Sequence, residues 1–391
     1  MPANAARLVA AHLLEAVLER GRSLEDGLDH APAADGRDKA AGHRIAAAVL
    51  RRLGSLDAAL EPWLRRDPPA PAKRALRIGA AELLLLGTPP HAAVSAAVSV
   101  VPRPLAGVVN AVLRRVAEAG PAALDGLDAE RLDTPAWLWA AWHAAHGARV
   151  RAIARAHREE APLDLSLRPG AEAPPGGEAL GNGSWRFPAG TRMTELPGFA
   201  EGAFWAQDQA AALPAALLAA RPGERVAELC AAPGGKTAQL AAAGAQVVAV
   251  EREARRIPRL RENLARLRLE AEVVQADAAQ WAPGVLFDAV LLDAPCTATG
   301  TVRRHPDVPH LKRPKDVPAL AQQQRALLEN AARLVRPGGR VVFATCSLQK
   351  EEGEDHLGAL PPGLVAEETR RTTPDMGMDG FFMARLRRAA P

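Results

Sequence analysis

The sequence has few cysteines, and their arrangement excludes two kinds of site. Only Cys230, Cys296 and Cys346 are present, and no two of them stand in a C-x-x-C pattern. An odd number of thiols with no histidine cluster beside them indicates neither a disulfide framework nor a zinc site. We therefore expect three reduced thiols and no bound metal.

Long hydrophobic runs are also missing. No stretch approaches the roughly 18 apolar residues that a membrane span requires. The first residues include Arg7 and Glu15 within a helical pattern, which is unlike a targeting signal. We predict a cytoplasmic protein without membrane contact.

Charge of one sign dominates only weakly. The 49 Lys and Arg residues outnumber the 45 Asp and Glu residues, which gives a formal net charge of +4. This excess favours an acidic partner, but a basic surface with no such partner would look the same. The 391 residues, 48% of them hydrophobic, exceed the usual size of one domain and predict two or three domains with separate cores.

The first third of the chain predicts an all-helical domain. Apolar residues recur at helical spacing over 5–20, 40–53, 71–87 and 91–118, and period-two alternation is absent. In GVVNAVLRRV, residues 107–116, the valines and leucine fall on one face while Arg114 and Arg115 fall outside it. We expect this domain to end near Gly120.

The next interval predicts one more helical stretch and then a loop. PAWLWAAWHAAHGARVRAIARAHREE contains Trp137, Trp139 and Trp142, which we interpret as core residues rather than as an aromatic surface. PGAEAPPGGEALGNGSW is rich in glycine and proline, which favours a loop or hairpin.

From Arg221 onward the pattern changes to short β-branched runs that alternate with helical ones. The strand-like runs are RVAELC, QVVAVE, AEVVQAD, FDAVLLDAP and RVVFATCS. Strands that alternate with crossover helices predict a Rossmann-like, doubly wound parallel sheet. Ligands of such sheets bind beyond the carboxyl ends of the strands.

The first of these strands runs into a glycine turn, ELCAAPGGKT, at residues 228–237. A phosphate-binding P-loop requires glycine at the position that Cys230 occupies, which excludes the ATPase interpretation. The absence of a G-x-G-x-x-G pattern disfavours a dinucleotide dehydrogenase. Gly234 and Gly235 instead predict a turn that lets a ligand approach the backbone at a helix N-terminus.

Acidic residues end three strands that succeed one another in the sequence. Glu251, Asp277 and Asp293 each stand at a predicted strand end. One such residue is more often a helix cap or a solvated charge. Three on one sheet edge, after a glycine turn, favour a ligand that contains adenosine.

Two cysteines share this predicted edge. Cys296 follows the fourth strand and Cys346 the fifth, with Arg303, Arg304 and His305 nearby in sequence. A lone cysteine is usually a small buried hydrophobe, but a pair at adjacent strand ends favours thiolate chemistry. Cys230 lies in the bend after its strand, where we expect a backbone contribution.

These motifs carry a family resemblance. ELCAAPGGKT, DAPCTATGTVRRHPD, ATCS with the acidic EEGED, and DGFFMARL resemble the bacterial RNA cytosine-C5 methyltransferases, which use S-adenosylmethionine. The match runs from Ala206 to Leu386. The first domain, with R-x-x-A-x-x-L-L-E-x-V and VVNAVLRRV, is similar to NusB. This fusion resembles the RsmB/Sun subfamily, which methylates cytosine 967 of 16S ribosomal RNA.

The resemblance implies a domain organisation. It gives a NusB-like RNA-binding domain over 1–122, a linker with a reduced RNA-binding subdomain over 123–205, and a methyltransferase domain over 206–391. Where the family normally opens its RNA-binding subdomain on L-R-V-N, this chain has LSLRPG and a short glycine-rich span.

The resemblance also implies residue roles. Cys346 would attack carbon 6 of the cytosine, Cys296 would assist breakdown of the covalent adduct, and Asp293 would hydrogen-bond or protonate nitrogen 3. Glu251, where the family more often has aspartate, would bind the ribose hydroxyls of S-adenosylmethionine, Asp277 would lie beside the adenine, and Asp293 would also border the cofactor. The cofactor loop would consist of Cys230, Ala231, Ala232, Pro233, Gly234, Gly235 and Lys236. Lys236 would meet either the methionine carboxylate or an RNA phosphate.

For RNA, the resemblance implies an unpaired or flipped target base. Candidate phosphate contacts are Arg303, Arg304 and Lys312, together with Arg51, Arg52, Arg114 and Arg115 of the helical domain. Because the chain has no tyrosine, stacking on the base would use Phe, Trp, His or Arg. We expect a monomer whose partner is 16S ribosomal RNA.

Two alternatives stay open at this point. The same reaction could act on transfer RNA or on another ribosomal position. The chain could also be a non-catalytic ribosome-assembly or antitermination factor, although a pure binding module has no use for two cysteines and three strand-end carboxylates.

Overall fold

The computed structural model describes residues 4–32 and 34–390. These residues form two compact units, which we treat separately. The helical unit runs up to Glu159 and also includes Val302–Lys312, whereas the α/β unit comprises Glu160–Thr301 and the chain from Arg313 onward. Within the described residues, no helix is long and apolar enough to cross a membrane. The boundaries at 122 and 205 stay predictions.

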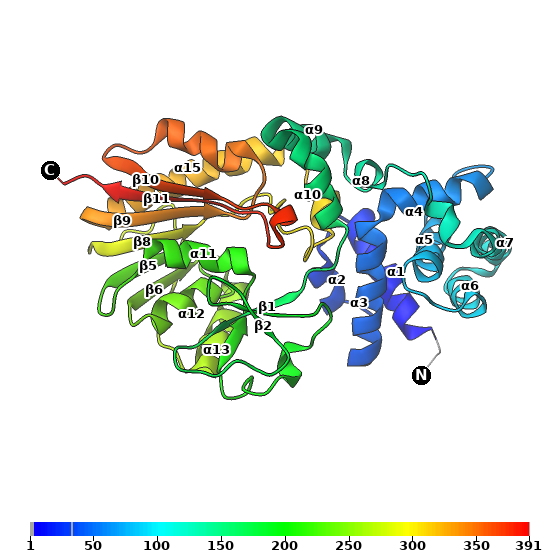
Figure 1. Cartoon of the computed structure of the whole chain (residues 1–391), viewed down its shortest axis with the longest axis horizontal. Helices are drawn as coiled ribbons and strands as arrows, with labels where there is room; N and C mark the ends of the chain where they lie inside the picture. Colours follow the sequence, from blue (N-terminus) through cyan, green and yellow to red (C-terminus); the bar gives the residue numbers. More distant parts are fainter. Residues whose placement is uncertain (1–3, 33, 391) are drawn as a thin grey trace. The chain divides into compact units, whose positions relative to one another are not determined.

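Up to Glu159 the helical unit consists of helices joined by short loops and 3-10 turns, and one more helix comes from Val302–Lys312 (Figure 1). They are α1 (Ala5–Leu18), α2 (Leu24–Asp29), α3 (Gly36–Arg51), α4 (Leu53–Leu60), α5 (Ala70–Leu84), α6 (Pro90–Ser99), α7 (Arg103–Ala119), α8 (Ala129–Leu132), α9 (Ala136–His146), α10 (Val150–His157) and α14 (Val308–Leu311). The expectation of an all-helical first domain is confirmed.

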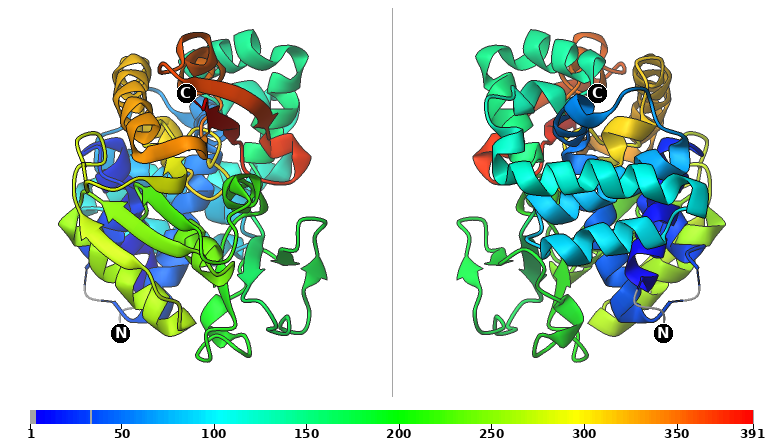
Figure 2. Two further views of the ribbon diagram at one scale, coloured as in Figure 1. Left: turned by 90° about the vertical axis from the view of Figure 1, so that its left-hand side faces the viewer. Right: turned by 90° about the vertical axis from the view of Figure 1, so that its right-hand side faces the viewer.

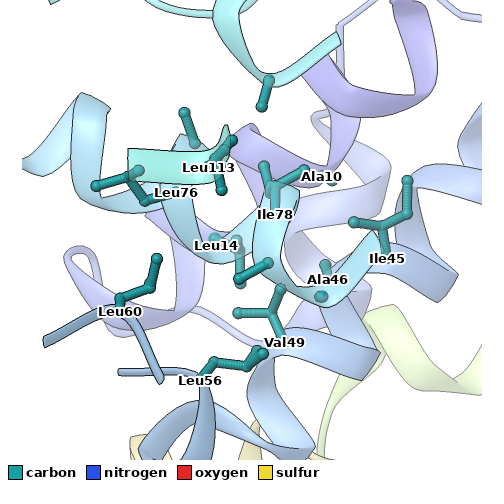
Figure 3. Close-up of a cluster of buried hydrophobic side chains, with 14 of the residues drawn as sticks. Ala10, Leu14, Ile45, Ala46, Val49, Leu56, Leu60, Leu76, Ile78 and Leu113 are labelled. Atoms are coloured by element: carbon teal, nitrogen blue, oxygen red, sulfur yellow. The ribbon is translucent and has the colours of Figure 1, made fainter. Parts of the chain in front are cut away.

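Apolar residues at helical spacing make the core of this unit. Leu14, Val49, Leu76 and Leu113 come from four helices and are at most 1% exposed, and Figure 3 shows how such side chains converge. Gly42 of α3 permits the close approach of α1, because a Cβ atom there would lie 2.6 Å from the Cβ of Val9. Burial of this shared face is what holds the helices together.

The helix expected over 91–118 is two helices, so that prediction was wrong. α6 ends at Ser99 and α7 begins at Arg103, because Pro102 cannot donate to the preceding turn and disfavours helical backbone before it. α2 and α4 were missed, since each is too short for periodicity to reveal.

The tryptophan-rich stretch is helical, as expected, and is divided by Gly147 between α9 and α10. Trp142 is 1% exposed and belongs to the core. Trp139 is half-buried, and the guanidinium groups of Arg131 and Arg151 lie 5.3 and 5.4 Å from its ring centre. The core interpretation therefore holds for Trp142, while Trp139 forms cation–π contacts.

The α/β unit begins with a small antiparallel sheet in the order β2-β3-β1-β4. Its strands are β1 (Leu163–Leu167), β2 (Glu178–Ala179), β3 (Trp185–Phe187) and β4 (Phe204–Ala206). Figure 2 shows these short strands and the long loops that join them. The glycine-rich span forms the β2–β3 pair, in agreement with the expected hairpin.

The large sheet of this unit has the strand order β10-β11-β9-β8-β5-β6-β7. The strands β5 (Arg225–Leu229), β6 (Gln246–Glu251), β7 (Glu272–Gln275), β8 (Phe287–Asp293) and β9 (Val335–Thr345) are parallel, whereas β10 (Leu364–Arg371) and β11 (Phe382–Arg388) pair antiparallel at one edge. The Rossmann-like, doubly wound class is confirmed. β10 and β11 were missed as strands, although DGFFMARL includes part of β11.

Helices cover both faces of this sheet, as a buried parallel sheet requires. Residues of α11 (Gln209–Leu218) and α12 (Gly235–Ala242) pack with Val226 and Leu291, and α13 (Ile257–Leu267) packs beside them on Ala249. α15 (Asp316–Leu334) packs on the opposite face with Ala227 and Leu292. The loops at the carboxyl edge, where the parallel strands end, are left to form a site.

Candidate active site at the carboxyl edge of the large sheet

The glycine turn after β5 is shaped by left-handed backbone. Cys230 has a φ of 63°, and the N–H of Ala231 donates to the carbonyl of Val250 at 3.1 Å. Gly234 has a φ of 102°, and a Cβ atom there would lie 2.4 Å from Cδ1 of Leu260. Glycine is therefore required at Gly234, which precedes the first turn of α12.

Gly235 has a different environment from its neighbour. A Cβ atom at Gly235 would meet nothing closer than 3.7 Å, so the fold itself tolerates a side chain there. This position opens α12, whose N-terminal N–H groups favour an anionic ligand.

Glu251 ends β6 and is only 3% exposed. One carboxylate oxygen accepts from the N–H of Ala232 at 3.2 Å, and the other accepts from the N–H of Glu253 at 2.9 Å. Arg256 lies 3.6 Å from the carboxylate. The side chain is thus fixed against the glycine turn, and each oxygen has further lone-pair capacity for a hydroxyl donor.

Asp277 follows β7 and is exposed. Its carboxylate accepts from the N–H of Ala279 at 3.0 Å, which caps the turn after the strand. Both acidic residues therefore lie at neighbouring strand ends, as expected, and both also stabilise local backbone.

Asp293 ends β8 and forms an ion pair with Lys236 of α12. The Nζ of Lys236 lies 2.7 Å from Oδ2 of Asp293 and 5.5 Å from the ring centre of Phe381. Burial alone would lower the pKa of Lys236, but Asp293 and other acidic neighbours together outweigh burial and raise the pKa above its usual value. Lys236 is therefore a buried cation whose partner is Asp293.

Glu228 belongs to this cluster and was not singled out from the sequence. It lies on β5, is 1% exposed, and accepts from Oγ1 of Thr237 at 2.5 Å. Burial raises its pKa to about 8, against the lowering effects of Thr237 and Lys236. The only available signal was a charged residue inside an apolar strand, which is rare unless it is paired.

Cys296 and Cys346 come together at this edge. Register pairs Asp293 with Ala344, so the chain leaves β8 and β9 side by side, and the two Sγ atoms lie 3.4 Å apart. The hydrogen bond with Cys346, followed by burial, raises the pKa of Cys296 well above its usual value. Cys296 is therefore a neutral thiol when Cys346 is free.

Cys230 differs from this pair. Burial, then Asp293 and Glu251, raise its pKa to about 12. A thiol held neutral in a backbone bend is a weak nucleophile, which agrees with the backbone contribution expected of it.

The candidate phosphate contacts lie in the helical unit. Arg303 is only 5% exposed, and its carbonyl accepts from Arg51 at 2.9 Å. Arg304 and Lys312 are half-buried, and Arg114 and Arg115 of α7 are exposed. Arg115 pairs with Glu118 at 3.2 Å, and Arg52 pairs with the buried Asp133, also at 3.2 Å.

No group of three or more His, Cys, Asp or Glu side chains is placed to hold a metal ion within residues 4–32 and 34–390. The polar side chains described above at the carboxyl edge instead include carboxylates, Lys236 and the three thiols.

Two family models match the chain. NusB family matches residues 4–118, and 16S rRNA methyltransferase RsmB/F matches residues 215–360. The protein described as ribosomal RNA small subunit methyltransferase B of Xanthomonas campestris is 37% identical over 99% of this chain and 98% of its own. The chain belongs to the RsmB/F family of 16S rRNA methyltransferases. The protein of the same description from Pseudomonas putida is 36% identical over 97% of this chain and 98% of its own.

Solved structures agree on the fold. The crystal structure of PH0851 has a TM-score of 0.78 at 22% identity and covers 99% of both chains. A methyltransferase homolog protein from Pyrococcus horikoshii has a TM-score of 0.56 at 24% identity, over 64% of this chain and 93% of its own. The family resemblance, the enzyme class and the joining of a NusB-like part to a methyltransferase are confirmed, and the non-catalytic alternative is set aside.

Proposed function

We propose that this rRNA methyltransferase transfers a methyl group from S-adenosylmethionine to carbon 5 of a cytosine in 16S ribosomal RNA, by resemblance cytosine 967, through a covalent bond between Cys346 and carbon 6. The observation that carries the proposal is the 3.4 Å approach of two thiols beside the ion pair of the buried Lys236 with the half-buried Asp293. A single nucleophile would need no second thiol.

The glycine turn and its neighbours fit the proposed cofactor. Gly235 leaves space at a helix N-terminus suited to a carboxylate, Glu251 offers oxygens suited to ribose hydroxyls, and Asp277 offers oxygens suited to an amino group. When bound, S-adenosylmethionine would supply an electrophilic methyl group. Because Lys236 already has Asp293 as its partner, we assign it to that aspartate rather than to the methionine carboxylate or a phosphate.

Carbon 5 of cytosine is a weak nucleophile, so the first step activates the ring. The Cys346 thiolate would form a bond to carbon 6, and the electron pair of the 5,6 double bond would move toward nitrogen 3. The positive charge of Lys236, held on Asp293, would stabilise the charge that develops there. Carbon 5 would then take the methyl group.

The last step removes the proton from carbon 5, and the electron pair left behind expels the Cys346 thiolate. The raised pKa of Cys296 supports its role in this step, because its largest cause is the hydrogen bond with Cys346. Once Cys346 is bonded to the base, that cause is lost, and the pKa of Cys296 falls. More of Cys296 is then thiolate, which is the form that can accept the carbon-5 proton at this stage.

Exposed arginines support an RNA substrate. Arg114 and Arg115 lie on the solvent face of α7, where phosphate contacts would position RNA without reading its sequence. Arg303 is buried, so a phosphate contact from its guanidinium would require its segment to move.

The reaction and its target are tested together. Purified protein is incubated with methyl-labelled S-adenosylmethionine and small-subunit ribosomal RNA that lacks its native methylations, and the label is mapped by nucleoside analysis. Label in 5-methylcytosine at cytosine 967 supports the proposal. 5-Methylcytosine label at another ribosomal position, or in transfer RNA only, would contradict cytosine 967 as the target but would still support methylation of cytosine at carbon 5.

The roles of the two thiols are tested by covalent trapping. Cys296→Ala should accumulate a protein–RNA complex that survives a denaturing gel, because the adduct forms but breaks down slowly. Cys346→Ala should form none. Equal amounts of complex from both variants would overturn the assignment.

A further inference from the structure

A buried carboxylate that the proposed mechanism does not use lies between the two thiol-bearing loops. Glu352 belongs to a 3-10 turn at Lys350–Glu352 and is 0% exposed. One carboxylate oxygen accepts from the N–H of Thr297 at 2.9 Å. The other accepts from the hydroxyls of Thr297 and Ser347, both at 2.5 Å. Thr297 directly follows Cys296, and Ser347 directly follows Cys346.

Further contacts complete this network on both sides. Nε2 of Gln324, from α15, lies 3.3 Å from Glu352 and donates to the carbonyl of Pro295 at 2.8 Å. Oγ1 of Thr299 accepts from the N–H of Leu348 at 3.0 Å. The residues before and after Cys296 are therefore both tied to the same carboxylate or its partners.

Simple cross-linking of the loops does not explain a glutamate at this place. The N–H of Gly300 already donates to the carbonyl of Cys346 at 2.9 Å, which joins the loops through backbone alone. Burial raises the pKa of Glu352, against the lowering effect of its donors, so the carboxylate is kept at an energetic cost. Glu352 adds a single hydrogen-bond acceptor that holds both Thr297 and Ser347, the residues that follow the two cysteines, in one geometry.

We propose that Glu352 is a positioning residue that holds the Cys296 and Cys346 thiols within reach of each other, so that both act on one cytosine. The inference rests on the proposed function for its catalytic consequence. The positioning itself can be measured without RNA or methyl donor.

The first readout is the rate at which Cys296 and Cys346 form a disulfide with each other when the thiol oxidant diamide is added. Mass spectrometry of peptides measures the disulfide over time. The full-length parent should pair these two thiols readily, because their Sγ atoms lie 3.4 Å apart. Glu352→Ala should slow the pairing at least about tenfold, since a misplacement of about 1 Å is costly in a reaction that depends on proximity. Glu352→Gln keeps the size of the side chain and one acceptor oxygen, so it should fall between the two.

The matched control is Glu224→Ala. Glu224 is also a poorly exposed glutamate, paired with Arg340, but it precedes β5 and lies at the opposite edge of the sheet. The Glu224→Ala variant should form the Cys296–Cys346 disulfide at the parental rate. If Glu352→Ala does not fold, Glu352→Gln carries the comparison.

The second readout is steady-state methylation. Glu352→Ala should lower kcat by about 10- to 100-fold and leave the KM for S-adenosylmethionine within about twofold, because the cofactor loop is untouched. A parental disulfide rate in both Glu352 variants overturns the inference, even if kcat and melting temperature fall. If Glu352→Ala slows disulfide formation but the parent protein methylates no RNA, the positioning role of Glu352 is supported and the proposed function is overturned.

Discussion

Two loops at the same sheet edge are built in different ways. The cofactor loop, Cys230–Lys236, takes its shape from backbone: left-handed Cys230 and Gly234 and the first turn of α12. The thiol edge, defined as Pro295–Thr301 with Thr345–Glu352, also has one left-handed residue, Ala298, and one backbone bond between its two segments. Its two segments are otherwise joined by side-chain hydrogen bonds between the loops that follow β8 and β9. The first loop bends through its own backbone and is held from β6, where Val250 and Glu251 accept from the N–H groups of Ala231 and Ala232. The thiol edge is instead joined by side-chain contacts such as that between Thr297 and Glu352, which stand 55 residues apart.

Because of this difference, the two loops should tolerate different substitutions. A backbone-built loop is sensitive to any side chain at its left-handed glycine and insensitive to its cysteine. A side-chain-built loop is sensitive to the loss of single oxygen atoms. The following predictions test that contrast, from the largest expected effect to the smallest.

The two loops should differ most in their cysteines. Cys346→Ala should lower kcat by at least about 10³-fold, because it removes the attacking atom. Cys230→Ala should change kcat by less than about threefold, since a thiol with a pKa near 12 is neutral and alanine keeps the Cβ atom. The rate of methyl transfer at saturating RNA measures kcat of both variants. A large loss of kcat in Cys230→Ala would contradict the contrast between the two loops.

Adjacent glycines of the cofactor loop should behave differently. Gly234→Ala should lower the free energy of unfolding by about 2–4 kcal/mol, because it combines a left-handed φ with a clash on Leu260. Gly235→Ala should change it by less than about 0.5 kcal/mol while weakening S-adenosylmethionine binding. Urea unfolding and calorimetric titration separate the two effects, and equal stability losses would contradict the assignment.

Glu228, beneath the cofactor loop, should give a distinctive pH dependence. Its folded pKa of about 8 exceeds the unfolded value of 4.5, so the folded state retains a proton that the unfolded state has lost. The free energy of unfolding should therefore fall by a few kcal/mol as pH rises from about 4.5 to about 8. Glu228→Gln should remove this fall, as measured by urea unfolding across that range.

Glu224→Gln serves as the opposite control for Glu228. The pKa of Glu224 is lowered: burial raises it, but Arg340 and the backbone N–H of Arg221 outweigh burial. Its stabilisation is present above the unfolded pKa and is lost as pH falls. Glu224→Gln should therefore cost stability at neutral pH, and a pH profile identical to that of Glu228→Gln would refute the distinction.

A single oxygen of the thiol edge should have the smallest measurable effect. Thr299→Val keeps the shape of the side chain but removes the acceptor for the N–H of Leu348, which should cost about 1–2 kcal/mol of unfolding free energy. Thr299→Ser keeps the oxygen and should recover most of that loss. Thermal unfolding compares them; equal behaviour of the two variants would show that the hydroxyl is unimportant.

The contrast also explains what could be predicted from sequence. Alternating strands and helices indicated the sheet, and its topology placed Glu251, Asp293, Cys296 and Cys346 at one edge. The turn at Gly234 was evident because left-handed backbone selects glycine locally.

Other features depended on distant residues. Glu228 and Glu352 gain their roles from Thr237, Thr297 and Ser347, contacts that no periodicity records. The break at Pro102 was overlooked because apolar spacing continues on both sides of it. The roles of the site residues stay predictions until the variants are measured.

The segment Val302–Lys312 has a consequence for synthesis of the chain. It packs in the helical unit, where the carboxylate of Asp307 accepts from the N–H of Leu24 at 2.9 Å and His310 bonds the carbonyl of Leu50 at 3.0 Å. The ribosome makes this segment only after most of the parallel strands. The NusB-like part therefore cannot complete its native contacts co-translationally until β5 to β8 have emerged, and a gene cut after Glu159 would encode an unfinished unit.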